Sequence, residues 1–190
     1  MAWANAGVCI FAFFVSCGSL AQVVHAAAPE ISIYKNKVYV NSPSGAKQVI
    51  LLDHDIKRED VRVEDLTFNG YHDLKILNER GAAQEFYNVY LYSSSLGKYV
   101  FNKKLSDIPC LQVDAEKKQL VGACFHISAC ENWSEHYAVT RLGRVSLVAR
   151  AGAYCDATGQ VYSYVDHFKN GKQISSKVIP VLNVPQRSPD

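Results

Sequence analysis

The chain has 190 residues, with 20 Lys and Arg against 18 Asp and Glu, and a formal net charge of +2. This near balance gives no reason to expect a nucleic-acid partner, because proteins that bind nucleic acids carry a strongly basic surface. The first charged side chain is Glu30, although about a quarter of the residues in a globular domain are charged. The opening segment is therefore not part of an ordinary folded domain.

The stretch before Glu30 is typical of a secretory signal peptide. It is almost wholly apolar or small from Gly7 to Val24 and ends in small residues, so we expect cleavage after Ala26. Two alternatives stay open, namely lipidation at Cys17, whose surroundings loosely resemble a lipobox, and an uncleaved anchor. We expect a signal peptide over residues 1–26 and a periplasmic or secreted protein without a membrane span in its mature form.

The cysteines of the remaining chain support export, because their even number and clustering suit disulfides. They are Cys110, Cys124, Cys130 and Cys155. Residues 111–123 predict a hairpin that places its two flanking cysteines opposite one another. The other two are equidistant from a turn at Leu142 and Gly143. We therefore predict the bridges Cys110–Cys124 and Cys130–Cys155. A zinc site is disfavoured, because no C-x-x-C spacing or histidine pair accompanies the cysteines.

Strand signals recur at short intervals along the chain. The first two runs, 31–34 and 37–40, flank a two-residue turn at Lys35 and Asn36 and predict a hairpin. Further runs rich in β-branched and aromatic residues follow, separated by glycine-containing turns. They are 47–52, 61–66, 73–77, 85–92, 98–102, 111–114, 119–126, 136–141, 144–150, 161–168 and 172–181. The pattern predicts an all-β fold, a single compact antiparallel domain over residues 27–184 that is sandwich- or propeller-like and stabilised by two disulfides, and a flexible tail at 185–190.

The segment 65–74 carries a pattern of oxygen-bearing side chains at alternate positions around a glycine. In a calcium-binding loop such side chains and one backbone carbonyl point inward at the ion. The candidate ligands are Asp65, Thr67, Asn69, the carbonyl of Tyr71, and Asp73. Because only two of the four side chains are carboxylates, we expect a weak or vestigial calcium site. The alternative is an Asn-Gly turn whose polar side chains satisfy the backbone.

The same segment resembles the D-x-N-x-D-G-x-x-D signature of secreted Gram-negative proteins related to periplasmic inhibitors of invertebrate-type lysozyme. That family includes immunity proteins against peptidoglycan hydrolases injected by type IV secretion systems. Further similarity lies in residues 87–92, 96–100, 105–108 and 114–118. The resemblance implies a compact all-β fold and inhibition of a lysozyme-like peptidoglycan hydrolase. Such an inhibitor inserts a loop into the substrate cleft, which in a lysozyme is lined by two acidic residues.

The longest candidate for an inserted loop runs from His126 to His136 and is tethered by Cys130. Trp133 would be its anchor, with His126 and Ser128 as hydrogen-bonding neighbours in the target-binding site. A core position for this tryptophan is the alternative.

Two other classes of function stay open. An enzyme would need general bases, which Asp53, His54 and the other histidines could supply. No G-x-S-x-G, H-E-x-x-H, P-loop or dinucleotide-binding motif occurs, so we expect no catalytic activity, including that of a cell-wall hydrolase. The other class is a calcium-stabilised structural or adhesion module of the cell envelope. Such modules usually repeat the calcium loop, which occurs once in this sequence.

Overall fold

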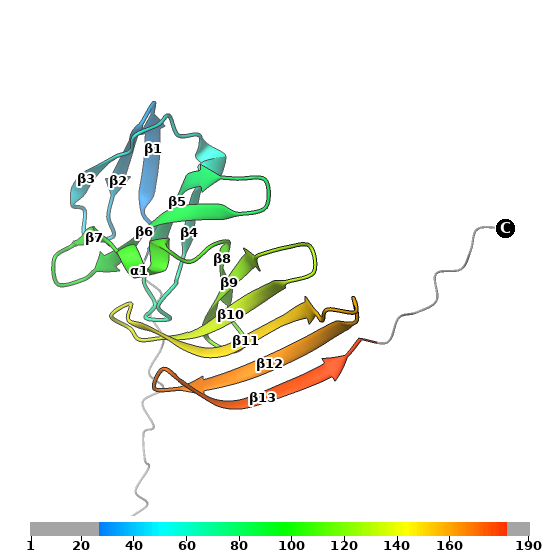
Figure 1. Ribbon diagram of the computed structural model, residues 1–190. Coiled ribbons are helices and arrows are strands. Elements are labelled where there is room, and N and C mark those ends of the chain that lie inside the picture. Colours follow the sequence, from blue (N-terminus) through cyan, green and yellow to red (C-terminus); the bar gives the residue numbers. More distant parts are fainter. Residues whose placement is uncertain (1–26, 182–190) are drawn as a thin grey trace, which may run out of the picture.

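The computed structural model describes residues 27–181, which form the strands β1 to β13, the short helix α1 and the 3-10 helix η1 (Figure 1). The predicted signal peptide at 1–26, Cys17 and the predicted tail at 185–190 lie outside these residues. Over residues 27–181, no helix combines the length and the apolar character that crossing a membrane requires.

The strands form three antiparallel sheets, so the all-β prediction is confirmed (Figure 1). The first sheet has the order β1 (Glu30–Tyr34), β2 (Lys37–Asn41), β3 (Lys47–Leu51). The second has the order β4 (Val61–Glu64), β5 (Asp73–Arg80), β6 (Glu85–Ser93), β7 (Lys98–Phe101). The third has the order β13 (Lys172–Pro180), β12 (Val161–Lys169), β11 (Val145–Cys155), β10 (Asn132–Val139), β9 (Gln119–His126), β8 (Leu111–Asp114). The helical segments are η1 (Arg58–Asp60) and α1 (Lys103–Ser106).

The second sheet is the middle layer between two hydrophobic cores. On one side Leu74 and Ile76 of β5 pack with Val38 and Ile50 of the first sheet. On the other side the second core joins β5 and β6 to α1 and to the inner strands of the third sheet. Because neighbouring side chains on a strand point to opposite faces, a strand between two cores is buried throughout. The first five residues of β5 are accordingly all buried.

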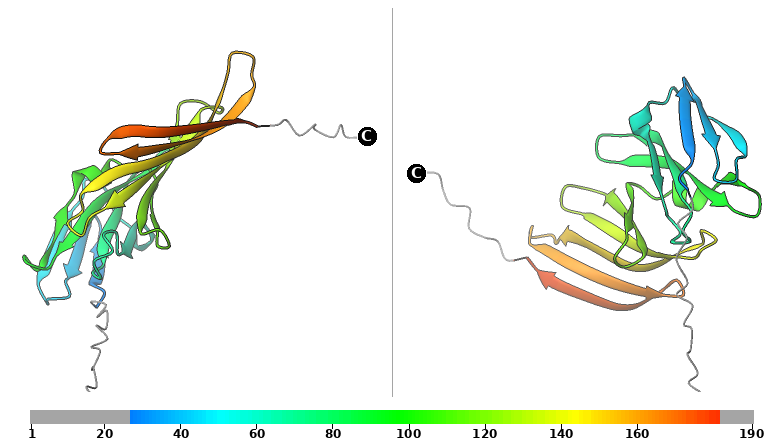
Figure 2. Two further views of the ribbon diagram at one scale, coloured as in Figure 1. Left: turned by 90° about the horizontal axis from the view of Figure 1, so that it is seen from below. Right: turned by 180° about the vertical axis from the view of Figure 1, so that it is seen from behind.

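The outer part of the third sheet extends beyond both cores (Figure 2). Leu120 of β9 is fully buried in the second core, whereas all nine residues of β13 are exposed. Between them, side chains on β10 to β12 are mostly half-buried. One face of this sheet thus changes from core to open surface as the strands run outward.

Both disulfides have the predicted pairing. Cys110 and Cys124 join the segment before β8 to β9, with a Cα–Cα distance of 5.9 Å. Cys130 and Cys155 join the turn between β9 and β10 to the end of β11, with a Cα–Cα distance of 5.8 Å. The prediction succeeded because each pair spans neighbouring strands or a single hairpin.

The predicted loop from His126 to His136 is wrong in its extent. Strand β9 runs through His126 and β10 begins at Asn132, so only residues 127–131 form a turn. The backbone of Asn132 pairs with His126, and that of Trp133 with Phe125. Ladder pairing of the two strands overrides the polar composition that suggested a loop.

Candidate functional site

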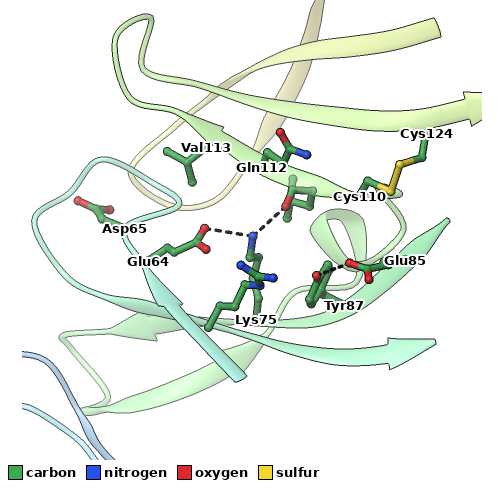
Figure 3. A pocket seen from close by; sticks show the side chains of 11 residues that line it. Glu64, Asp65, Lys75, Glu85, Tyr87, Cys110, Gln112, Val113 and Cys124 are labelled. Carbon is green, nitrogen blue, oxygen red and sulfur yellow. Dashed lines mark hydrogen bonds and ion pairs between the residues drawn. A yellow bond between two sulfur atoms is a disulfide. The ribbon is translucent and has the colours of Figure 1, made fainter. Parts of the chain in front are cut away.

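A cavity of about 500 Å³ lies between the second sheet and strand β8 (Figure 3). The Lys75 side chain inside it is only 4% exposed. Its Nζ donates a hydrogen bond to the Leu111 carbonyl oxygen at 2.8 Å and forms an ion pair with Glu64 Oε2 at 3.1 Å. Burial lowers the pKa of Lys75, and the Glu64 carboxylate opposes that shift. The ammonium group therefore joins the second and third sheets.

Glu85, another charged group that lines this cavity, also has partners within the chain. Glu85 accepts a hydrogen bond from the Tyr87 hydroxyl at 2.7 Å and pairs with Arg80 at 2.8 Å. These two contacts lower the pKa of Glu85. The buried ammonium of Lys75 is compensated by Glu64 within the chain, so we interpret the cavity as a polar contact that holds the two sheets together.

The predicted calcium loop is a tight turn between β4 and β5. The Asp65 carboxylate accepts hydrogen bonds from the backbone N–H groups of Asn69 at 3.1 Å and Gly70 at 2.8 Å. Asn69 Oδ1 accepts one from the N–H of Tyr71 at 2.8 Å. Gly70 has φ 89°, a conformation that glycine adopts without strain. Through these hydrogen bonds the side chains of Asp65 and Asn69 fix the backbone of the loop.

Asp73 closes this loop and is only 1% exposed. It accepts hydrogen bonds from the N–H groups of Leu66 at 3.0 Å and Tyr92 at 2.9 Å. Burial raises the pKa of Asp73 to about 7, and the nearby Asp65 carboxylate adds to the rise. The buried Thr67 hydroxyl has no hydrogen-bond partner within residues 27–181. Two neighbouring carboxylates and an unpartnered hydroxyl are donors that suit Ca²⁺.

The charge available to such an ion is low. Over the described part of the chain, no group of three or more His, Cys, Asp or Glu side chains could hold a metal. Because calcium affinity rises with the number of carboxylate ligands, the donor set fits a weak site.

The predicted target-binding residues lie on strands β9 and β10 and in the turn between them. His126 and Ser128 are exposed, and Ser128 Oγ accepts hydrogen bonds from the N–H groups of Cys130 and Glu131, which close the turn. Trp133 is half-buried in β10. Because Trp133 pairs with Phe125, and Phe125 and His126 are neighbours, Trp133 and His126 point to opposite faces.

Trp133 is held in a rigid row of side chains. Its ring stacks on Phe125 with centroids 5.5 Å apart, and the Arg150 guanidinium lies 5.7 Å from the Trp133 ring centroid. Glu135, only 8% exposed, accepts hydrogen bonds from the Trp133 indole N–H at 3.3 Å and from the Tyr137 hydroxyl. It also pairs with Arg150 at 2.6 Å. Trp133 therefore belongs to the fixed inner part of the uncovered sheet face.

The exposed turn between β10 and β11, residues 140–144, contains the turn predicted at Leu142 and Gly143 but was not among the predicted binding residues. We call it the basic turn. Leu142 at its tip is 79% exposed. Arg141 and Arg144 flank it, are exposed, and form no ion pair with any residue in 27–181. Two arginines around a Leu-Gly turn are the sequence signal that could have drawn attention to it.

The backbone of the basic turn is fixed. Within the turn, the N–H of Gly143 donates to the Thr140 carbonyl at 2.8 Å, and the N–H of Thr140 donates to the Arg144 carbonyl at 2.9 Å. From the second sheet's side, Asn102 Nδ2 donates to the Gly143 carbonyl at 3.3 Å. These hydrogen bonds hold the turn in one backbone conformation, with Leu142 exposed at its tip.

Two other connections meet the basic turn. A cavity of about 370 Å³ is lined by Arg141 and Leu142, by Asn69 of the calcium loop, and by residues 93–96 after β6. Leu96 there is 60% exposed. The exposed side chains of Leu96 and Leu142 therefore lie beside polar groups of Asn69 and Arg141 around this cavity.

No protein-family model matches the chain, and no curated protein sequence matches it. Among solved structures, the chain is similar to one described as a Xanthomonas type IV secretion system related protein. The TM-score is 0.59, the sequence identity is 15%, and the match covers 82% of each chain. The likeness shows that this chain shares its fold with a protein related to that secretion system.

Proposed function

We propose that this chain is an exported protein that inhibits a lysozyme-like peptidoglycan hydrolase, as a lysozyme inhibitor or an effector immunity protein. The basic turn is the observation that carries the proposal. It is a rigid projection with an apolar tip between two arginines that have no ion-pair partner in the described chain. The cleft of a lysozyme is lined by two carboxylates, and guanidinium groups pair well with carboxylates.

Two further observations support the general class. The paired disulfides suit an oxidising compartment outside the cytoplasm. The fold is shared with a protein related to a type IV secretion system. Together with the resemblance of the segment 65–74 to secreted inhibitors, they favour a binding protein that meets a cell-wall enzyme.

Inhibition would follow from occupation of the cleft. Leu142 would bury its side chain against apolar walls, while Arg141 and Arg144 approach the catalytic carboxylates. Because the turn is already fixed by its hydrogen bonds, little conformational entropy is lost on binding. A side chain in the cleft then excludes the glycan substrate.

The turn at residues 127–131 is the competing element, since Ile127 is 70% exposed. That turn contains Glu131 and no lysine or arginine. A carboxylate beside an acid-lined cleft would be repelled, so charge favours the basic turn. His126, Ser128 and Trp133 stay predicted contacts that mutation can test.

The experiment is an assay of peptidoglycan lysis by a panel of lysozymes, with and without the purified chain. We expect inhibition by the chain and no lysis by the chain alone. The variant Arg141→Ser with Arg144→Ser should lose inhibition, whereas Ile127→Ser should keep it. Lysis by the chain alone would instead favour the enzyme alternative.

We also propose a structural calcium ion at Asp65, Thr67, Asn69, the Tyr71 carbonyl and Asp73. The buried, unpartnered Thr67 hydroxyl favours this proposal. When bound, the ion would neutralise the two neighbouring carboxylates and stiffen the loop beside the basic turn. A calcium-stabilised adhesion module would share this site, but would not inhibit a hydrolase.

A further inference from the structure

A shallow groove of about 320 Å³ lies on the open face of the third sheet, at the opposite end of β10 from the basic turn. We call it the acid–aromatic groove. It is lined by Glu131, Tyr154, Tyr164, Asp166, Gln173, Ser176 and Val178. Strand pairing brings these positions together, because Tyr164 pairs with Val178 and Asp166 with Ser176 across β12 and β13.

Aromatic rings form the walls of this groove. Tyr154 stacks on Tyr162 with centroids 5.4 Å apart, and it lies 6.1 Å from Tyr164 in a tilted arrangement. Gly152 pairs with both Trp133 and Tyr164, and a Cβ there would stand 2.6 Å from Trp133 Cβ. The absence of a side chain at Gly152 lets Asn132 and Trp133 of β10 approach β11 closely at this position.

Two carboxylates line the groove, and no lysine or arginine does. Glu131 and Asp166 form no ion pair within residues 27–181, and Gln173 Nε2 donates to Asp166 at 3.3 Å. Burial raises the pKa of Tyr164, the Arg150 guanidinium opposes the rise, and the carboxylates of Asp166, Glu131 and Glu135 add to it. Arg150 lies opposite Asp166 in the register of β11 and β12, and its guanidinium is paired with Glu135 at 2.6 Å.

We propose that the acid–aromatic groove binds one lysine or arginine side chain of a partner protein. A cation between carboxylates and the faces of tyrosine rings gains from both ion pairing and cation–π attraction. Val178, which is 48% exposed at the groove's edge, adds apolar surface. Tyrosine rings with apolar neighbours are the composition of protein interfaces, which favours a protein over a small free cation.

The proposal is independent of the hydrolase, and its test uses peptides alone. The ¹H–¹⁵N spectrum of the chain is recorded with acetylated and amidated Gly-Arg-Gly, Gly-Lys-Gly and Gly-citrulline-Gly. The charged peptides should give saturable shifts at Tyr164, Asp166 and Gln173. The citrulline peptide, which keeps the shape and loses the charge, should bind roughly tenfold more weakly. Equal binding of all three, or shifts outside the groove, would overturn the proposal.

Variants separate the two attractive groups. The double variant Glu131→Gln with Asp166→Asn should weaken binding of the arginine peptide by roughly tenfold. Tyr164→Leu should weaken it by roughly fivefold. Glu116→Gln, in the turn before β9, is the matched surface control and should leave binding unchanged. Analytical sedimentation at rising protein concentration tests whether a second copy of this chain occupies the groove instead. Self-association that disappears in Arg141→Ser with Arg144→Ser would mean that a second copy fills the groove, against the proposal.

Discussion

Gly143 in the basic turn lies against Leu91 of β6 so closely that a Cβ on Gly143 would stand 2.1 Å from Leu91 Cδ1. This contact seats the turn on the second sheet. It also makes the position intolerant of any side chain, since Gly143 has φ 74° as well.

We therefore predict that Gly143→Ala lowers the free energy of unfolding by about 2–4 kcal/mol, from the clash and the left-handed backbone together. Gly159 is a matched control, because it has φ 84° and nothing lies within 4 Å of its Cβ position. Gly159→Ala should cost only about 1 kcal/mol. Urea denaturation of both variants measures the difference, and equal losses would show that the Leu91 contact does not fix the turn.

Lys75 should be a strong determinant of stability, because its ammonium joins two sheets. Lys75→Met leaves Glu64 without its cation and the Leu111 carbonyl without its donor, so we expect a loss of about 2–4 kcal/mol in the free energy of unfolding. Lys103→Met breaks an exposed pair with Asp107 and should cost less than about 0.5 kcal/mol. Similar losses in the two variants would refute the role assigned to Lys75.

The raised pKa of Asp73 predicts a pH dependence. The pKa of Asp73 is about 7 in the folded state against an ordinary aspartate pKa of 3.8, so the folded state holds this proton more tightly than the unfolded state. Stability should then fall as the pH rises from about 4 to about 7 and level off above that. Asp73→Asn should flatten this part of the profile. The measurement is urea denaturation across this range with a chelator present, and an unchanged profile in Asp73→Asn would contradict the assignment.

Calcium should raise the melting temperature by a few degrees relative to a chelator. For a site with a Kd of about 1 mM, about 10 mM calcium adds about 1.4 kcal/mol to the free energy of unfolding. The effect should be larger at pH 8, where Asp73 is ionised, than at pH 6. Asp65→Asn should abolish it. An identical melting temperature with calcium and with chelator at pH 8 would refute the proposed calcium site.

Much of the fold was predictable because local signals agree with the tertiary structure. Lys35 and Asn36 join β1 to β2, and Lys35 takes the positive φ of 53° that such a tight turn needs. The disulfide Cys110–Cys124 followed from the same reasoning, since its cysteines flank one predicted hairpin.

The functional surfaces were harder to predict because they depend on contacts between distant segments. Residues 140–144 were recognised as a turn, but only packing on Leu91 and Asn102 makes that turn rigid. The acid–aromatic groove requires the register of three strands, which sets Tyr154, Tyr164 and Val178 on one face. Trp133 was placed in a loop because the sequence does not reveal the pairing of its backbone with Phe125.

The central claim is tested most directly by the inhibition constant of the chain against the lysozyme of the panel that it inhibits most strongly. We predict that Arg141→Ser with Arg144→Ser weakens inhibition by roughly 30-fold or more, the size of an interface hot spot, at an unchanged melting temperature. Ile127→Ser should inhibit like the unmodified chain. Full inhibition by the double arginine variant would contradict the account.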